Sequence, residues 1–137
     1  MKTPTLTTCP ARAFTLLEMT IVIMVLIALL STGLFISRKT NDWKLGRQAS
    51  ETLRSVYSAQ RQYLADNPTV SVSVLTNILL LPYMPNSPAA MPTVTSLSNT
   101  TLTIIVNVMP PVVNNGIGVA YDPSGSTTDS LWDVGPP

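Results

Sequence analysis

Three aspartates, Asp122, Asp129 and Asp133, lie close together in a segment rich in glycine, serine and threonine. Carboxylate oxygens on such a loop are suitable ligands for calcium, which takes about six to eight oxygens. Their spacing does not match an EF-hand loop. We therefore interpret the segment as a solvated polar loop, with calcium bound by these three residues as the alternative. No other metal or cofactor is expected.

The residue types needed for most enzyme sites are missing from this sequence. It contains no histidine, which excludes histidine-based acid–base catalysis, histidine metal sites and nucleophile–histidine–carboxylate triads. The one cysteine, Cys9, allows neither an intrachain disulfide nor a cysteine-ligated metal. Serine and threonine are abundant, but none has a base partner that would activate it. We expect a protein that is not an enzyme.

Glu18 is the unusual charge, because it lies at the start of a long apolar run. From Met19 to Ser37 no residue is charged. As a helix this run would be about 29 Å long, close to the hydrocarbon thickness of a bilayer. A carboxylate costs about 2.5–3.5 kcal/mol at the bilayer centre and less near the interface. Glu18 is therefore either a carboxylate at the membrane interface that has no functional role or a carboxylate that pairs with a cation from another subunit.

The composition fits one small domain attached to a membrane segment. The chain has 137 residues, of which 45% are hydrophobic and 11% charged. A typical soluble domain carries about 25% charged residues. The net charge of +1 argues against a protein that binds nucleic acid by neutralising phosphates. A mean hydropathy of +0.31 agrees with part of the chain lying in lipid.

A proline-free stretch predicts one long helix from about residue 14 to about residue 66. Its second half, from residue 38, is amphipathic, and Asn67-Pro68 is a suitable stop. The core-facing stripe is predicted to contain Ala49, Leu53, Val56, Tyr57 and Leu64, with Gln60 interrupting it. Such a helix would be about 80 Å long, so we expect its apolar first half to protrude.

Residues 68–137 predict a small antiparallel β-sheet packed on the amphipathic half of the helix, an α+β fold. We expect strands at 70–74, at 100–108, which Pro110-Pro111 would end, and at 116–121. We also expect a helical turn at 77–81, a proline-rich loop at 82–92 and a turn at 122–125. Trp132 is expected to anchor the terminal loop in the core. Trp43, with Arg38 and Lys39, fits an interfacial belt, and a packing role for Trp43 between helices is an equal alternative.

The run from Ala13 to Val22, AFTLLEMTIV, resembles the cleavage signal of type IV pilins and type II secretion pseudopilins. This resemblance covers about residues 11–37. It implies that a prepilin peptidase removes residues 1–13 by cutting between Ala13 and Phe14. Phe14 would then carry an N-methyl group, and Glu18 would make the contact between subunits during assembly. The domains would be a leader at 1–13, a membrane or filament-core helix at 14–37, and a pilin-like domain at 38–137, divided into a helix half at 38–67 and a β-rich region at 68–137.

The sequence also departs from the usual pattern of that family. Ala13 replaces the usual glycine before the cut, and Phe35 stands where many members have a proline that kinks the helix. A kink would therefore have to arise at Gly33. The mature chain would contain no cysteine, since Cys9 would leave with the leader.

The resemblance implies a structural subunit of a pilus or secretion pseudopilus. Its partners would be copies of itself, related pilins, the prepilin peptidase, the inner-membrane assembly platform and the lipid bilayer, and no nucleic acid. It would lie in the bacterial inner membrane with a periplasmic C-terminal domain before joining a filament. Positive charges flank the apolar run on both sides, so the positive-inside rule alone does not give this orientation.

Two alternatives remain from the sequence. The first is a single-pass anchored periplasmic scaffold or binding protein that does not polymerise. The second is a membrane-tethered enzyme, which the missing catalytic residues disfavour. A secretory signal peptide followed by a soluble domain is rejected, because the apolar run is too long and no convincing cleavage site follows it.

Overall fold

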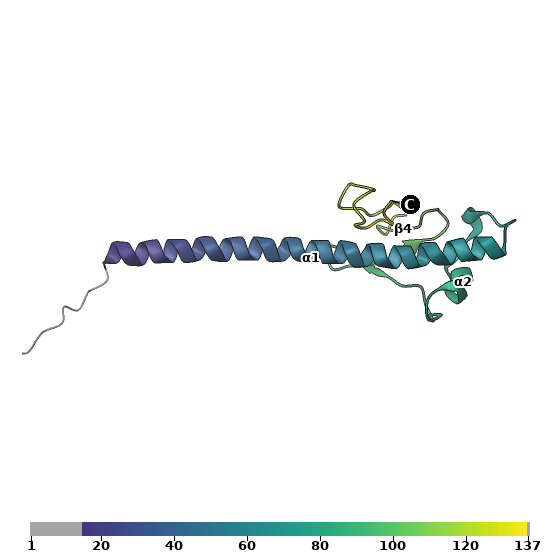
Figure 1. The fold of residues 1–137 in the computed structure, drawn as a ribbon, viewed down its shortest axis with the longest axis horizontal. Coiled ribbons are helices and arrows are strands. Elements are labelled where there is room, and N and C mark those ends of the chain that lie inside the picture. Colours follow the sequence, from purple (N-terminus) through teal and green to yellow (C-terminus); the bar gives the residue numbers. More distant parts are fainter. Residues whose placement is uncertain (1–14, 137) are drawn as a thin grey trace, which may run out of the picture. The chain divides into compact units, whose positions relative to one another are not determined.

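A computed structural model of the chain describes residues 15–136. Its main element is one helix, α1, which runs from Leu16 to Asp66 without interruption (Figure 1). The predicted long helix is therefore confirmed within the described residues, and α1 stays helical through Gly33. Asn67 ends it because Pro68 follows, and both the backbone and the side-chain amide of Asn67 donate to the carbonyl of Tyr63 at 3.0 Å.

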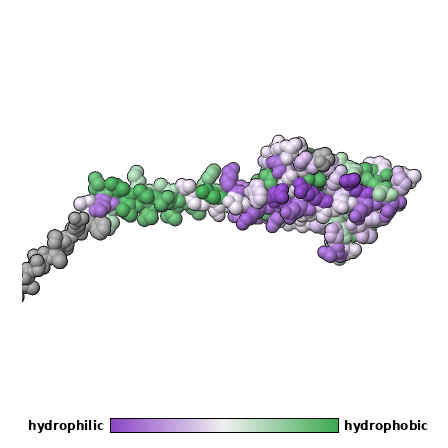
Figure 2. Space-filling view, viewed as in Figure 1, coloured by the Kyte–Doolittle hydropathy of each residue, from purple (hydrophilic) through white to green (hydrophobic). Residues whose placement is uncertain are grey.

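The chain divides into two compact units between Arg38 and Lys39. The described part of the first unit is helical, and all of its side chains are exposed. Figure 2 shows apolar residues along this part of α1 and a mixed polar and apolar surface on the second unit.

The second unit is built around one face of α1. Ala49, Leu53, Val56 and Ala59 are buried at steps of three and four, so they form one stripe along the helix. Fully burying a leucine or valine side chain contributes about 1.5–3 kcal/mol. The predicted stripe is confirmed at its first three positions, and Tyr57 and Leu64 are half-buried at its margin.

Two short antiparallel sheets supply much of the remaining core. β1 (Val94–Thr95) pairs with β2 (Thr101–Leu102), and β3 (Ile104–Ile105) pairs with β4 (Val112–Val113). Val94 lies opposite Leu102, and Ile104 lies opposite Val113. These four side chains are buried with the helix stripe, together with Leu75, Leu80, Met84, Val106 and Trp132.

The predicted strand at 100–108 has the right alternation but not the right pairing. Leu102, Ile104 and Val106 are all buried while Thr101 and Thr103 are exposed, as a strand requires. The pairing partner changes at Thr103, whose carbonyl accepts a hydrogen bond from Asn114 at 2.8 Å. The expected single sheet is therefore two sheets of two strands each.

Two further predictions about the β-rich region were wrong. Residues 70–74 do not form a strand, because Val72–Val74 is a 3-10 helix, η1. Residues 116–121 form no strand beyond a single bridge between Asn114 and Ala120. The strand predicted to end at Pro110-Pro111 does stop before these prolines, at Ile105, and β4 begins directly after them.

The loop at 114–120 replaces that strand because its backbone is turned. Gly116 and Gly118 have positive φ angles of 97° and 84°, which glycine adopts without steric cost. The Asn114 side-chain oxygen accepts hydrogen bonds from the amides of both glycines, at 3.0 and 2.9 Å. Such asparagine-centred turns compete with strand pairing.

The expected helical turn is present as α2 (Asn77–Leu80), followed by the 3-10 helix η2 (Leu81–Tyr83). The segment after Tyr121 contains no helix or strand up to residue 136. Pro123 and Ser124 form the predicted turn. Trp132 is 4% exposed and lies edge-on to Tyr121 with ring centroids 5.1 Å apart, so it does anchor this segment in the core.

Candidate functional site

Glu18 lies in the first turn of α1, three residues after Thr15, which caps the helix. The Thr15 hydroxyl oxygen accepts a hydrogen bond from the Glu18 amide at 3.2 Å. Thr15 and Glu18 have the spacing of a capping box, a signal that our sequence interpretation missed. The positive end of the helix dipole also favours a carboxylate in this turn. The Glu18 side chain is therefore placed on an ordered helix end and is exposed.

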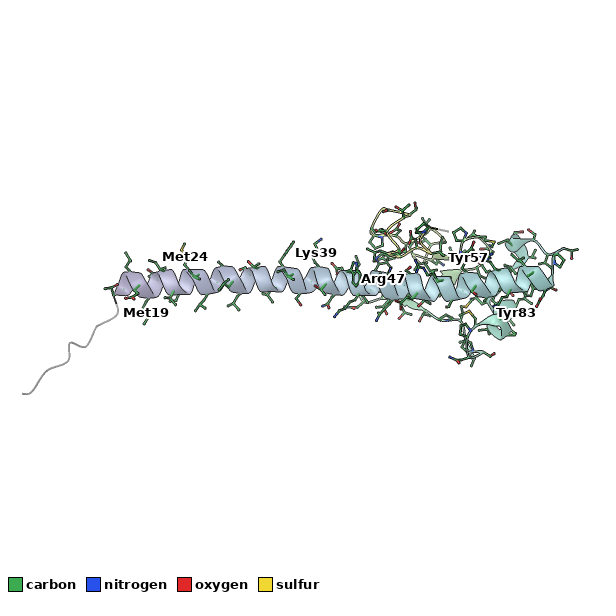
Figure 3. The ribbon with its side chains drawn as sticks, in the orientation of Figure 1. Met19, Met24, Lys39, Arg47, Tyr57 and Tyr83 are labelled. Carbon is green, nitrogen blue, oxygen red and sulfur yellow. The ribbon has the colours of Figure 1, made fainter. Side chains whose placement is uncertain are left out.

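The surface that follows Glu18 is apolar on every side of the helix. Its most apolar 18-residue window has a mean hydropathy of 2.6, and none of that window is buried. Met19 and Met24 project outward from the ribbon in Figure 3, and they are 50% and 75% exposed. By length and composition this part of α1 can cross a membrane.

Three polar side chains of this segment have hydrogen-bond partners within the helix. The hydroxyls of Thr20, Ser31 and Thr32 donate to the carbonyls of Leu17, Ile27 and Ala28, at 2.8, 2.9 and 3.0 Å. An unpaired hydroxyl would be costly in lipid or in a dry helix bundle. The segment is thus suited to either apolar environment, with Glu18 as its one carboxylate.

The predicted cleavage and methylation residues, Ala13 and Phe14, lie outside the described residues. The leader at 1–13 lies outside them as well. The assembly role of Glu18 therefore stays a prediction; the structure shows only that Glu18 lies in the first turn of α1.

The three candidate calcium ligands do not form a metal site in the described structure. Within residues 15–136, no group of three or more histidine, cysteine, aspartate or glutamate side chains could hold a metal ion. Asp122 instead accepts hydrogen bonds from the amide and hydroxyl of Ser124, at 3.0 and 2.7 Å. Asp129 accepts one from the Leu131 amide at 2.9 Å. These contacts are those of polar turns.

Asp133 is in a less favourable environment than the other two aspartates. Both of its carboxylate oxygens are enclosed, and neither has a hydrogen-bond partner among the described residues. Burial raises the pKa of Asp133, and the nearby charges of Asp129 and Asp122 raise it further. The Gly135 backbone and the Arg54 guanidinium oppose this rise only in part.

Arg54 and Gly46 hold the terminal segment against α1, and the sequence did not single out either residue. The Arg54 guanidinium donates to the carbonyl of Val134 at 2.9 Å and to the hydroxyl of Ser130 at 3.0 Å. The Trp132 amide donates to the Gly46 carbonyl at 3.2 Å. No sequence signal links residues so far apart in the chain.

Comparisons of the chain with protein-family models, with curated proteins and with solved structures found no match.

Proposed function

We propose that this chain is a prepilin-like subunit that is matured by removal of a leader and polymerises through α1. The observation that supports it is a helix surface that is apolar on all sides and unburied, with one carboxylate in its first turn. A soluble domain would bury such a surface. A helix that only anchors a protein in a membrane requires the apolar surface but does not require the Glu18 carboxylate.

The proposed assembly step follows from charge pairing in a dry environment. Cleavage between Ala13 and Phe14 creates an amine at the start of the apolar helix. In a bundle of such helices, the Glu18 carboxylate of one copy meets the Phe14 amine of its neighbour. Burying an ion pair is favourable only when both partners are present. If two neighbouring helices are shifted along their axes, Glu18 is buried without its partner, so the incorrect axial register is disfavoured. The packing of leucine, isoleucine and valine surfaces supplies most of the attraction.

In this proposal the unassembled subunit lies in the bacterial inner membrane with residues 38–137 in the periplasm. It is then extracted into a pilus or pseudopilus by the assembly platform. Its activity is mechanical and structural, without catalysis.

Replacing Glu18 tests the proposal directly. Glu18→Ala should insert into membranes normally but lower filament yield at least about tenfold, because the neighbour's amine is left buried and unpaired. Glu51→Ala is the matched control, since Glu51 is an exposed acid on the same helix but outside the apolar segment. Sedimentation and electron microscopy of sheared filaments measure the yield. Filament yield of Glu18→Ala equal to wild type would disprove the assigned role.

The competing function is a single-pass anchored scaffold in the periplasm, which the same apolar helix would also serve. It predicts a chain that keeps its leader and stays monomeric in the membrane.

A further inference from the structure

A groove in the second unit lies beside the first turns that follow the apolar segment. Its volume is about 280 Å³, and Lys39 and Trp43 of α1 line it together with Leu97, Pro123 and Leu131. Trp43 is 56% exposed and Leu97 is 40% exposed. The carboxylate of Asp42 and the polar Ser124 line the groove as well. The groove thus combines apolar side chains and an exposed aromatic ring with one cation, Lys39, and one carboxylate, Asp42.

The stretch of α1 that supplies Lys39, Asp42 and Trp43 to the groove carries more positive than negative charge. Between residues 38 and 47 the helix carries four cationic side chains and one carboxylate, namely Arg38, Lys39, Lys44, Arg47 and Asp42. Figure 3 labels Lys39 and Arg47, about two turns apart on the helix. The Arg47 guanidinium lies 5.9 Å from the centroid of the Trp43 ring, within the range of a cation–π contact.

The cations and Trp43 begin within the depth of a lipid headgroup layer and extend just beyond it. Lys39 is two residues beyond Ser37, where the uncharged run ends, which is about 3 Å of helix; Trp43 is about 9 Å and Arg47 about 15 Å beyond it. The headgroup region extends about 5–8 Å beyond the hydrocarbon on each side of a bilayer. Side chains on a helix tilt toward its N-terminus, so Trp43, Lys44 and Arg47 lean toward the apolar segment. Trp rings and long cationic side chains favour this interface.

We propose that Trp43, Lys44, Arg47 and the adjoining groove bind the headgroups of anionic phospholipids while the subunit resides in the membrane. Four cations against one carboxylate, Asp42, favour anionic over zwitterionic lipid, and the Trp43 ring leans toward the interface between headgroups and acyl chains. This inference rests on the membrane-anchored state of the proposed function, but not on polymerisation.

The test uses the full chain reconstituted in vesicles of phosphatidylcholine with a minority of phosphatidylglycerol. Bromine atoms, which quench tryptophan fluorescence, are placed either on the phosphatidylglycerol or on an equal amount of the phosphatidylcholine. Subtracting the signal of Trp43→Phe isolates the contribution of Trp43, because the chain has two tryptophans. We expect brominated phosphatidylglycerol to quench Trp43 about twofold more than brominated phosphatidylcholine.

The charge variants identify the cause of that preference. The quenching ratio is the quenching of Trp43 by brominated phosphatidylglycerol divided by its quenching by brominated phosphatidylcholine. Lys44→Glu and Arg47→Glu should each lower this ratio toward one. Arg61→Glu is the matched control: Arg61 also lies 5.9 Å from an aromatic centroid, that of Tyr57, but about 21 Å further along α1 than Arg47. Its ratio should equal that of wild type. Lys44 is exposed, so its substitution leaves the core intact.

A wild-type ratio of one would overturn the proposal. So would weak quenching by both lipids that increases as the protein is diluted in lipid, since that result assigns the groove to a second copy of the chain. Flotation of the vesicles separates these outcomes from a failure of the proposed function, because a chain that does not insert remains at the bottom of the gradient.

Discussion

At the scale of single residues, Gly46 shows how a small side chain allows two segments to meet. A Cβ at this position would lie 2.9 Å from Nε1 of Trp132 and 3.2 Å from the Leu131 side chain. Trp132 cannot easily move, because it is buried and packed against Tyr121. Glycine is therefore required by the close approach of the terminal segment, although it weakens a helix interior by about 1 kcal/mol.

Gly46→Ala should lower the free energy of unfolding of the second unit by about 1–2 kcal/mol, since overpacking outweighs the gain in helix propensity. Denaturant unfolding followed by tryptophan fluorescence measures the change. Gly33→Ala is the control, because nothing lies within 4 Å of the added Cβ, and it should leave this transition in place. A Gly46→Ala protein as stable as wild type would show that Trp132 does not pack there.

Asp133 predicts a dependence of stability on pH. Its pKa is raised in the folded protein, so the folded state holds its proton more tightly than the unfolded chain does. Stability from this group is therefore present below the unfolded pKa, near 3.8, and is lost as pH rises through the folded pKa. Asp133→Asn should raise the melting temperature at pH 7, and the gain should shrink as the pH falls to about 3. A gain of the same size at both pH values would argue against this cause.

At the scale of elements, Gln60 connects α1 to the strand region. It is fully buried, and its side-chain nitrogen donates to the carbonyls of Val106 at 2.7 Å and Val108 at 3.1 Å. These two carbonyls follow β3 and lie where no strand pairs with them in the described structure. Gln60, which interrupts the apolar stripe of α1, thus provides the hydrogen-bond donor for backbone carbonyls that pair with no strand.

Gln60→Leu should destabilise the second unit by about 1–3 kcal/mol, because the Val106 carbonyl loses its donor in a buried environment and the Val108 carbonyl loses its donor in a half-buried one. The midpoint of chemical denaturation gives the change. Gln62→Leu, at an exposed position of the same helix, should shift the midpoint much less. Equal shifts for the two variants would show that the Gln60 hydrogen bonds contribute nothing.

The helix could be predicted from the sequence more fully than the sheets. Its start, its stop at Asn67-Pro68 and its buried stripe depend on local patterns that a sequence displays. The change of partner at Thr103 and the strand at Val94–Thr95 depend on contacts between distant segments. The contacts of Gly46 and Arg54 could not be predicted for the same reason, because their partners lie about 80 residues later in the chain. Glu18 was evident because a charge in an apolar run is visible locally.

At the scale of the whole molecule, α1 serves two environments along one continuous helix. From Leu16 to Ser37 the helix exposes a largely apolar surface suited to lipid or to other helices, and beyond residue 45 it buries one face in a compact unit. In the proposed function both halves of α1 are needed. Removal of the leader would create the Phe14 amine, which pairs with Glu18 of a neighbouring copy when the exposed halves assemble.

Intact-mass spectrometry of the protein isolated from its native membrane tests this account most directly. We predict a mass that corresponds to loss of residues 1–13 and gain of one methyl group. A full-length chain, or one cleaved after Gly33, would contradict the proposed maturation and favour an uncut anchor or a secreted domain.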